Sequence, residues 1–289
     1  MANPILSVVI ANYNYGRFLE EAILSVISQG MGDKVELIIC DAASTDNSVE
    51  IIKKYADHIA WWCSEKDGGQ SAAFNKGFAH ARGEWLTWLN ADDLYFPGVF
   101  EALFKVVQKY PQTEWITGNK VHFDSISGRI VSVNWGPHFQ PPLLSGNHAI
   151  SAVFGPSTFF RKSLYERMGH IDEHLHYAMD SAYWAKFTMA GVRQTRLNRF
   201  CWAFRNHEES KTAGIQTDVI ALKRQEETER WRSEIGYKYK VSLSNIWYVL
   251  WLGWRIFDGS LIYRTILKTR FEGTSIGRLI PNLKGGYDE

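Results

Sequence analysis

The chain has 289 residues, of which 45% are hydrophobic and 22% charged. This composition is typical of a globular protein that buries a sizeable core, and it excludes disordered and fibrous classes. The 32 Lys and Arg nearly balance the 31 Asp and Glu, so charge gives no reason to expect a nucleic-acid partner.

Cysteine usage and the chain ends indicate the compartment. The three cysteines, Cys40, Cys63 and Cys201, are odd in number and lack metal-binding spacing, which favours buried thiols in a reducing compartment. The first ten residues, MANPILSVVI, do not resemble a secretory signal peptide. The apolar run over residues 246–254 is too short to span a bilayer. We therefore expect a cytoplasmic protein, with the inner face of the cell membrane as an alternative location.

The first 95 residues alternate between strand and helix signals. Short apolar runs predict strands over residues 6–10, 36–40, 59–63 and 85–89, and helical spacing predicts helices over residues 18–29, 49–55 and 70–80. Strands that are apolar on both faces, alternating with helices, predict a parallel sheet covered on both sides. Ligands of such sheets bind at the carboxyl ends of the strands. The loops at 11–16, 41–47, 65–70 and 90–93 are therefore the candidate site.

The pattern changes in the second part of the chain. Pro97 suits the first turn of another helix, and shorter strand-like pieces follow at 115–117, 121–123 and 130–133. From about residue 216 the chain becomes charged and helical, then strongly aromatic, with no low-complexity linker or repeat. We predict one domain over residues 1–215 and a C-terminal helical extension over residues 216–289.

Carboxylates occur in three of the four candidate loops, as Asp41, Asp67 and the adjacent pair Asp92 and Asp93. Two neighbouring carboxylates repel each other and are costly to bury unpaired, so a cation is expected nearby. Oxygen ligands on a short loop suit Mg²⁺ or Mn²⁺, which complete their coordination with substrate phosphates. The alternative is that Asp93 caps the helix starting near Phe96 and that Asp92 is solvated.

Two common phosphate-binding motifs are absent. No G-x-G-x-x-G follows the first predicted strand, and no G-x-x-x-x-G-K-[ST] occurs anywhere in the sequence. Phosphate would then have to be held by the metal.

Four blocks of sequence, in order, resemble consecutive blocks of the family 2 glycosyltransferases. They are SVVIANYNYGRFLEEAILSVISQG, ELIICDAASTDNSVEIIKKY, SEKDGGQSAAFNKGFAHARGEWLTWLNADDLYFPG and GPSTFFRKSLYERMGHIDEHLHYAMDSAYWAKF, and they span roughly the first two thirds of the chain. The resemblance implies an α/β GT-A fold, with a Rossmann-like, mostly parallel central sheet flanked by helices. It also implies a nucleotide-binding half over about residues 1–95 and an acceptor and catalytic half over about 96–215.

The resemblance further implies an inverting, metal-dependent transfer from a nucleotide-diphospho-sugar donor. The acceptor would be a hydroxyl of a glycan or lipid-linked molecule in surface polysaccharide synthesis. In such enzymes the base is held by the loop after the first strand and by the Asp of a D-x-x-S-T-D block, here Ala11, Asn12, Tyr13 and Asp41.

The family's D-x-D-type motif falls on Asn90-Ala91-Asp92. The resemblance implies that Asp92 binds Mn²⁺ or Mg²⁺ and that Asn90 binds the ribose. An amide at the first position accepts a hydrogen bond but brings no charge to the metal, which would lower metal affinity.

Candidate partners for the donor diphosphate also depart from the family pattern. Where relatives often carry an arginine before the Asn-x-Gly step, this chain has Phe74. Lys76 is then the remaining candidate cation on that segment. Gln70, at the end of the 65–70 loop, is a further candidate donor ligand.

The resemblance places the catalytic base at Asp180, in HYAMDSAYW. Such a base takes a proton from the acceptor hydroxyl while the transition state resembles an oxocarbenium ion and the metal stabilises the leaving diphosphate. The structural alternative is a helix N-cap ahead of residues 181–187, and both roles are compatible.

His207, in FRNHEESKT, resembles a late histidine that binds metal or phosphate in relatives. A solvated loop histidine is the alternative. Arg205 and Lys211 flank it and would neutralise phosphate charge.

The segment 246–268 interleaves Trp and Tyr with Arg and Lys. This mixture suits a helix at a bilayer surface, close to a lipid-linked acceptor. The alternative is a helix packed against the domain or at a subunit interface.

Two other functions stay open. A sugar nucleotidyltransferase is expected to carry a glycine-rich basic loop after its first strand, where this chain has ANYNYG. A non-catalytic protein, binding a nucleotide sugar or assembling at a membrane, is suggested by Asn90 and Phe74. Metal-dependent donor hydrolysis separates these functions.

Overall fold

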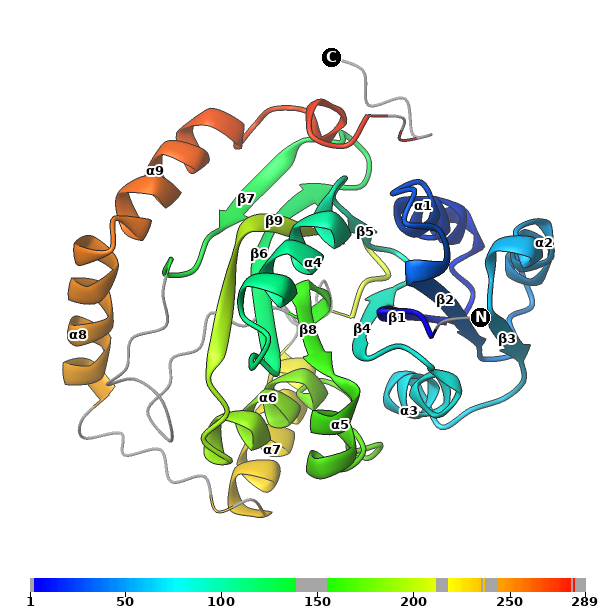
Figure 1. The fold of residues 1–289 in the computed structure, drawn as a ribbon, viewed down its shortest axis with the longest axis horizontal. Helices are drawn as coiled ribbons and strands as arrows, with labels where there is room; N and C mark the ends of the chain where they lie inside the picture. Colours follow the sequence, from blue (N-terminus) through cyan, green and yellow to red (C-terminus); the bar gives the residue numbers. More distant parts are fainter. Residues whose placement is uncertain are drawn as a thin grey trace.

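The computed structural model describes residues 3–138, 155–211, 218–234, 236, 244–281 and 283. One sheet runs through them in the order β3-β2-β1-β4-β8-β6-β9-β5, with β7 paired to β6 (Figure 1). Its strands are β1 (Leu6–Asn12), β2 (Val35–Asp41), β3 (Trp61–Ser64), β4 (Trp85–Asn90), β5 (Leu94–Tyr95), β6 (Trp115–Asp124), β7 (Ile130–Asn134), β8 (Thr158–Arg161) and β9 (Gln194–Asn206).

Helices cover both faces of the sheet and continue into a C-terminal arm. They are α1 (Gly16–Ile27), α2 (Ser48–Lys54), α3 (Gln70–His80), α4 (Val99–Lys109), α5 (Lys162–Met168), α6 (Met179–Met189), α7 (Asp218–Glu234), α8 (Ser244–Phe257) and α9 (Ser260–Phe271). Short 3-10 turns occur at Gly32–Lys34, Ala56–His58, Gly155–Ser157 and Ile276–Arg278.

The strands β3, β2, β1 and β4 are parallel, as the sequence predicts. Along β1, Val8 and Ile10 pack in the cluster that includes α1, whereas Val9 packs with α3 on the opposite face. Side chains of a strand alternate between faces, so burial on both sides explains the unbroken apolar runs. Gly77 lets α3 approach closely, because a Cβ there would lie 2.3 Å from Val9 Cγ1.

The second half of the sheet is mixed. Strand β8 is antiparallel to β4 and β6, and β6 is parallel to β9. The predicted strand pieces at 115–117 and 121–123 are one strand, β6, which pairs with β9 along its length through two register irregularities near Gly118. A Cβ at Gly118 would lie 2.1 Å from Cys201 Sγ, so the glycine permits the close contact that keeps the strand continuous. The predicted α/β class is confirmed.

The C-terminal segment packs against the rest of the protein. Trp231 of α7 is buried in the core cluster that includes α6, and α9 packs along β7, with α8 next to α9 (Figure 1). Arg255 of α8 is buried and donates a hydrogen bond to the Trp135 carbonyl at 2.6 Å. Through these contacts, helices of the segment 246–268 pack against the domain, as the packed-helix alternative predicts. Among the described residues, no helix is both long and apolar enough to cross a membrane.

Three strand ends meet at one edge of the sheet. In the strand registers Asn12 lies opposite Asp41, and Ala11 lies opposite Asn90. The loops that follow β1 and β2 contain Asn14 and Ala43, which have φ of 56° and 57° and are the non-glycine residues with positive φ in the described part of the chain. Left-handed backbone costs a residue such as alanine about 1–2 kcal/mol and occurs most often at functional sites.

Candidate active site

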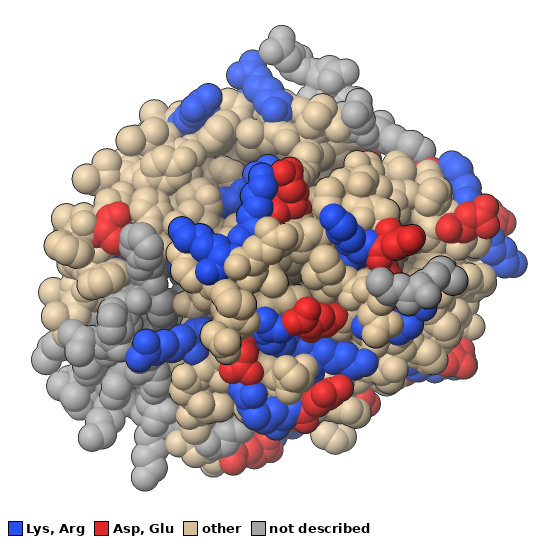
Figure 2. Space-filling view, in the orientation of Figure 1, with Lys and Arg blue, Asp and Glu red and all other residues tan. Residues whose placement is uncertain are grey.

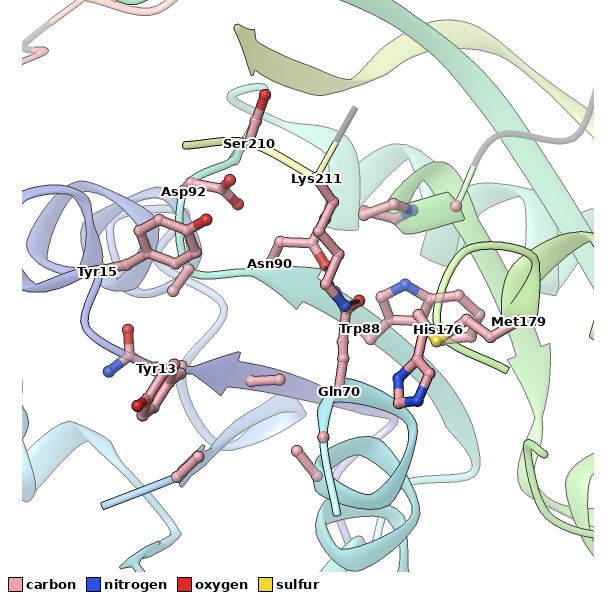
Figure 3. Close-up of a pocket in the computed structure, with 18 of the residues that line it drawn as sticks. Tyr13, Tyr15, Gln70, Trp88, Asn90, Asp92, His176, Met179, Ser210 and Lys211 are labelled. Carbon is pink, nitrogen blue, oxygen red and sulfur yellow. Dashed lines mark hydrogen bonds between the residues drawn. The ribbon is translucent and has the colours of Figure 1, made fainter. Parts of the chain in front are cut away.

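A cavity of about 840 Å³ opens at this edge, between the two halves of the sheet. Residues predicted from the sequence that line it include Ala11, Asn12, Tyr13, Gln70, Asn90, Ala91, Asp92 and Asp180. In Figure 3, Tyr13 and Tyr15 border one side, Asn90 and Asp92 extend from the end of β4, and His176 and Met179 lie on the other side. The fold thus joins residues as far apart in the sequence as Ala11 and Asp180, because both halves of the chain contribute to one sheet.

Asp41 lies behind the cavity wall. Its carboxylate accepts hydrogen bonds from Asn12 Nδ2 at 2.7 Å, from the Ser44 N–H at 3.0 Å and from Ser64 Oγ at 2.5 Å, and it is buried. The predicted direct contact of Asp41 with a base has no support in this position, and we assign Asp41 to ordering the loop around Ser44. Tyr13, by contrast, is 61% exposed at the cavity, where its ring face is available for stacking.

The Asp93 carboxylate is fully buried beneath the cavity. It accepts hydrogen bonds from the Arg205 N–H at 3.0 Å and from Asn90 Nδ2 at 2.8 Å. Burial, followed by the charge of Asp92, raises the pKa of Asp93 well above its usual range. The helix α4 has Gly98 at its N-cap position and no side-chain cap. The helix-capping alternative for Asp93 is therefore wrong.

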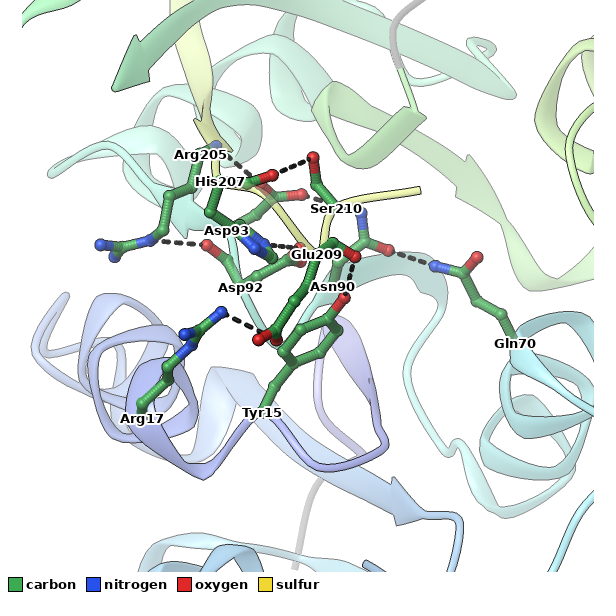
Figure 4. A network of polar contacts seen from close by, with 10 residues as sticks. All are labelled: Tyr15, Arg17, Gln70, Asn90, Asp92, Asp93, Arg205, His207, Glu209 and Ser210. Atoms are coloured by element: carbon green, nitrogen blue, oxygen red, sulfur yellow. Dashed lines mark hydrogen bonds and ion pairs between the residues drawn. The ribbon is translucent and has the colours of Figure 1, made fainter. Parts of the chain in front are cut away.

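Asn90 connects α3 to this buried carboxylate (Figure 4). Its side-chain oxygen accepts a hydrogen bond from Gln70 Nε2 at 2.7 Å, and its nitrogen donates to Asp93. An aspartate at this position would place a third negative charge beside Asp92 and Asp93 and would remove the donor. The departure from the D-x-D pattern thus fits the surrounding hydrogen bonds.

Asp92 pairs with His207, as Figure 4 shows. The distance from Asp92 Oδ2 to His207 Nε2 is 2.9 Å, and their side chains are 12% and 4% exposed. The His207 ring packs against Tyr15 and Phe18, with centroids 5.5 and 4.9 Å away. His207 is therefore not a solvated loop histidine. The described residues contain no cluster of three or more His, Cys, Asp or Glu that would hold a metal by itself.

Arg205 is buried behind the Asp92 loop rather than in the cavity. Its Nε donates to the Asp92 carbonyl at 2.9 Å, its Nη2 pairs with Glu21, and its guanidinium lies over the rings of Phe18 and Phe123. These contacts assign Arg205 to holding the loop, in place of the predicted contact with substrate phosphate.

Lys76 also lies outside the cavity lining, where it pairs with Glu65 at 3.0 Å. Lys211 does line the cavity, and its Nζ donates to Gln70 Oε1 at 3.0 Å (Figure 3). The other lysines and arginines that line it are Lys66, Lys120 and Arg224. Sequence reasoning missed Lys120 and Arg224. The one signal for Lys120 is its two-residue spacing from His122 in a predicted strand region, which puts both on one face.

Asp180 lies in the first turn of α6, where Ala178 is the residue at the N-cap position. Its Oδ1 accepts a hydrogen bond from the adjacent Ser181 N–H at 2.6 Å. The N-cap alternative is therefore wrong, because the helix already includes Asp180. A Cβ built on Gly155 would lie 3.8 Å from Asp180 Oδ2 and 3.7 Å from the Trp202 ring. The carboxylate and this ring thus both lie next to Gly155.

Glu227 of α7 fixes the segment that leads into α6. Its carboxylate accepts hydrogen bonds from three consecutive backbone N–H groups, those of His176 at 3.0 Å, Tyr177 at 2.8 Å and Ala178 at 3.2 Å. Amides just before and at the start of a helix lack intrahelical partners, and an anion suits them. This contact joins residues 50 positions apart, so local sequence gives no sign of it.

We expect Glu227→Gln to lower the free energy of unfolding by about 1–3 kcal/mol, since it weakens hydrogen bonds to a charged acceptor. Denaturant unfolding of the full chain measures the effect. Glu226→Gln is the matched control, because Glu226 is the exposed neighbour on the same helix. Equal denaturation midpoints for the two variants would contradict the stabilising role of the Glu227 hydrogen bonds.

The sequence matches the family model described as glycosyl transferase family 2 over residues 7–169, more than half of the chain. An uncharacterized glycosyltransferase of Nostoc sp. is 38% identical over 141 residues, which cover 48% of this chain and 42% of that protein. An uncharacterized glycosyltransferase of Rickettsia typhi is 28% identical over 240 residues, which cover 78% of this chain and 70% of that protein. The chain therefore matches less than half the length of the Nostoc relative.

Solved structures share the fold at low sequence identity. TarS 1–349 of S. aureus, in complex with UDP-GlcNAc, has a TM-score of 0.65 at 16% identity, covering 86% of this chain and 72% of TarS 1–349. The mannosyltransferase PcManGT from Pyrobaculum calidifontis, in complex with GDP-Man and Mn²⁺, has a TM-score of 0.54 at 16% identity, covering 92% and 87%. The family model and this shared architecture together show that the chain belongs to glycosyl transferase family 2 and has the GT-A fold.

Proposed function

We propose that the protein transfers a sugar, with inversion, from a nucleotide-diphospho-sugar to a hydroxyl of a glycan or lipid-linked acceptor in surface polysaccharide synthesis. The observation that carries this proposal is that one cavity is lined by Asn90 and Asp92, at the end of β4, and by Asp180, in the first turn of α6. A donor-side group and a base on opposite sides suit a single in-line displacement, which inverts the anomeric carbon.

The donor nucleotide is assigned to the side formed by the loop after β1. Ala11, Asn12 and Tyr13 line this side, and the exposed Tyr13 ring offers a stacking surface for the base. Asn90 keeps a second lone pair on its side-chain oxygen beyond the bond from Gln70, so it can still accept from a ribose hydroxyl. Lys211, which reaches Gln70, brings a positive charge toward the diphosphate.

The Asp92 carboxylate is a ligand type that suits Mn²⁺ or Mg²⁺. His207 Nε2 lies 2.9 Å from this carboxylate and is proposed as a second donor. His207 Nε2 is the nitrogen that faces Asp92. The other ring nitrogen, Nδ1, is buried without a hydrogen-bond partner among the described residues. With two protein donors, the remaining positions would go to donor phosphates and water. A bound divalent ion would neutralise charge on the leaving diphosphate.

Asp180 is proposed as the general base. It is partly exposed in the cavity, so an acceptor hydroxyl can reach the carboxylate. The carboxylate would accept the hydroxyl proton as the oxygen bonds to the anomeric carbon, while the nucleoside diphosphate leaves toward the Asp92 side. Glu227 holds the chain just before this residue through three hydrogen bonds and thereby positions it.

The test is release of nucleoside diphosphate from a panel of UDP- and GDP-sugars, with Mn²⁺, with Mg²⁺ or with EDTA. We expect slow hydrolysis of at least one donor that stops in EDTA. Binding without any hydrolysis or transfer would favour the non-catalytic alternative. Formation of a nucleotide sugar from a sugar phosphate and a nucleoside triphosphate would favour the nucleotidyltransferase.

Part of the predicted membrane segment 246–268 forms an exposed apolar face. Phe257 is 82% exposed, and Val249, Ile262 and Ile266 are also exposed. Lys268 and Arg270 are exposed on the adjacent part of α9. Apolar side chains next to cations match the surface of an anionic bilayer. We assign this face to peripheral contact with the membrane that carries a lipid-linked acceptor.

We expect the double change Phe257→Asp and Ile262→Asp to reduce binding to anionic phospholipid vesicles at least tenfold. Burying each side chain contributes roughly 1.5–3 kcal/mol, which the aspartates would remove. Co-sedimentation with vesicles measures binding. The control is Ile126→Asp, because Ile126 is 87% exposed in the turn between β6 and β7. Unchanged co-sedimentation of the double variant with vesicles would rule out membrane contact through this face.

A further inference from the structure

The side of the cavity opposite the donor loops is a platform made by β6 and β9. Lys120 lies opposite Trp202, and His122 lies opposite Phe204, in the parallel register of the two strands. All four residues line the cavity, as expected for two-residue spacing along a strand. We call them the β6–β9 platform.

The platform combines a cation with aromatic faces. Lys120 Nζ lies 4.7 Å from the centroid of the Trp202 ring and 5.6 Å from that of Phe204. The His122 and Phe204 rings are 4.7 Å apart. Burial and then the Lys120 charge lower the pKa of His122 to about 4, so the histidine is neutral near pH 7. The positive charge of the platform is therefore that of Lys120.

A second cation that lines the cavity comes from α7. Arg224 is exposed and lines the cavity. Burial is the main cause that lowers the pKa of Lys120, the carboxylates Asp180 and Asp93 raise it, and the Arg224 charge lowers it further. Lys120 and Arg224 thus both bring positive charge to the cavity that Asp180 also lines.

The proposed donor side has a cation of its own, Lys211, whose Nζ donates a hydrogen bond to Gln70 Oε1 at 3.0 Å. Burial lowers the pKa of Lys211, whereas the charges of Asp92 and Glu227 raise it. On the face shown in Figure 2, acidic and basic side chains are interspersed. Two cations beside the proposed base are more than a neutral hydroxyl requires.

We propose that the acceptor carries an anionic group, a phosphate or a carboxylate, close to the hydroxyl that receives the sugar. Lys120 and Arg224 bind this group, and the adjoining sugar ring packs on Trp202 and Phe204. Arg and Lys form charge-assisted hydrogen bonds to such anions, and aromatic faces pack well against the C–H face of a sugar. This inference rests on the proposed function, since it names the acceptor class of the same site.

The test uses protein saturated with nucleoside diphosphate and Mn²⁺, so that the donor side is occupied. Three probes are titrated by calorimetry: glucose 1-phosphate, glucuronate and methyl glucoside. We expect glucose 1-phosphate or glucuronate to bind at least tenfold more tightly than the neutral methyl glucoside. The tighter of the two anions identifies the group as phosphate or carboxylate. Equal affinities for all three would overturn the proposal.

The variant Arg224→Gln tests whether the preference for anionic over neutral probes depends on Arg224. We expect it to reduce the preference for the anionic probe about tenfold, and Lys223→Gln, which changes the exposed neighbour, to leave it intact. Lys120→Gln is expected to act in the same direction, and a melting curve checks that it folds. If Lys120→Gln does not fold, Arg224→Gln decides alone. An undiminished preference in Arg224→Gln would overturn the assignment.

The same titration separates this inference from the proposed function. Failure of nucleoside diphosphate to bind with Mn²⁺ would contradict the proposed donor site itself. Normal diphosphate binding with no preference for anionic probes would contradict only the acceptor class.

Discussion

Asp180→Asn is expected to bind donor normally and to lose sugar transfer by roughly 10²–10⁴-fold, the usual contribution of acid–base catalysis. The amide has nearly the same shape as the carboxylate, and its oxygen can still accept the bond from the Ser181 N–H that Asp180 Oδ1 accepts at 2.6 Å. It cannot accept a proton from the acceptor hydroxyl. The substitution therefore removes the proposed chemistry and keeps the local contact.

Donor affinity, transfer and a melting curve should be measured together for this variant. Ser181→Ala is a useful control, because it changes the neighbouring side chain of the same helix turn and leaves the carboxylate. A folded Asp180→Asn protein with near-normal sugar transfer would contradict the assignment of Asp180 as the general base. Asp172 and Glu173 would then be the next carboxylates to test.

Asp92→Ala is expected to abolish most of the gain in nucleoside-diphosphate affinity that Mn²⁺ provides. Loss of a residue that only supports a metal ligand costs about 10–100-fold in metal affinity, so loss of a direct ligand should reach at least the upper end of that range. His207 would remain as a single donor, which is too few to hold a hard cation against water. Binding without metal should change little.

Titrations of wild type and Asp92→Ala with nucleoside diphosphate, in Mn²⁺ and in EDTA, measure this effect. Asp67→Ala is the matched control, because Asp67 is another carboxylate of the same cavity and is bonded to the Gly69 N–H at 2.8 Å. If Mn²⁺ strengthens binding equally in wild type and Asp92→Ala, then Asp92 is not a metal ligand. An equal loss in Asp67→Ala would instead indicate a general effect of cavity charge.

The sequence by itself determined the order of the parallel strands β1 to β4 and of the helices α1 to α3 between them. Apolar runs buried on both faces and helical spacing are local properties, and the predicted helix at 70–80 agrees with α3 (Gln70–His80). The predicted strand at 85–89 differs from β4 by one residue. The same local order put the loops of 11–16 and 90–93 at strand ends, so most predicted donor-side residues line the cavity.

Only the tertiary structure decided which charged groups face that cavity. From the sequence, Arg205 and Lys76 are candidates to bind substrate phosphate. In the structure, Arg205 forms an ion pair with Glu21, and Lys76 forms one with Glu65. Asp92 meets His207 across 115 positions, and Arg224 and Glu227 reach the site through the packing of α7. The partner of a charged side chain depends on which strands and helices become neighbours. Local sequence carries no record of those contacts, because they form between segments brought together by burial of the shared core.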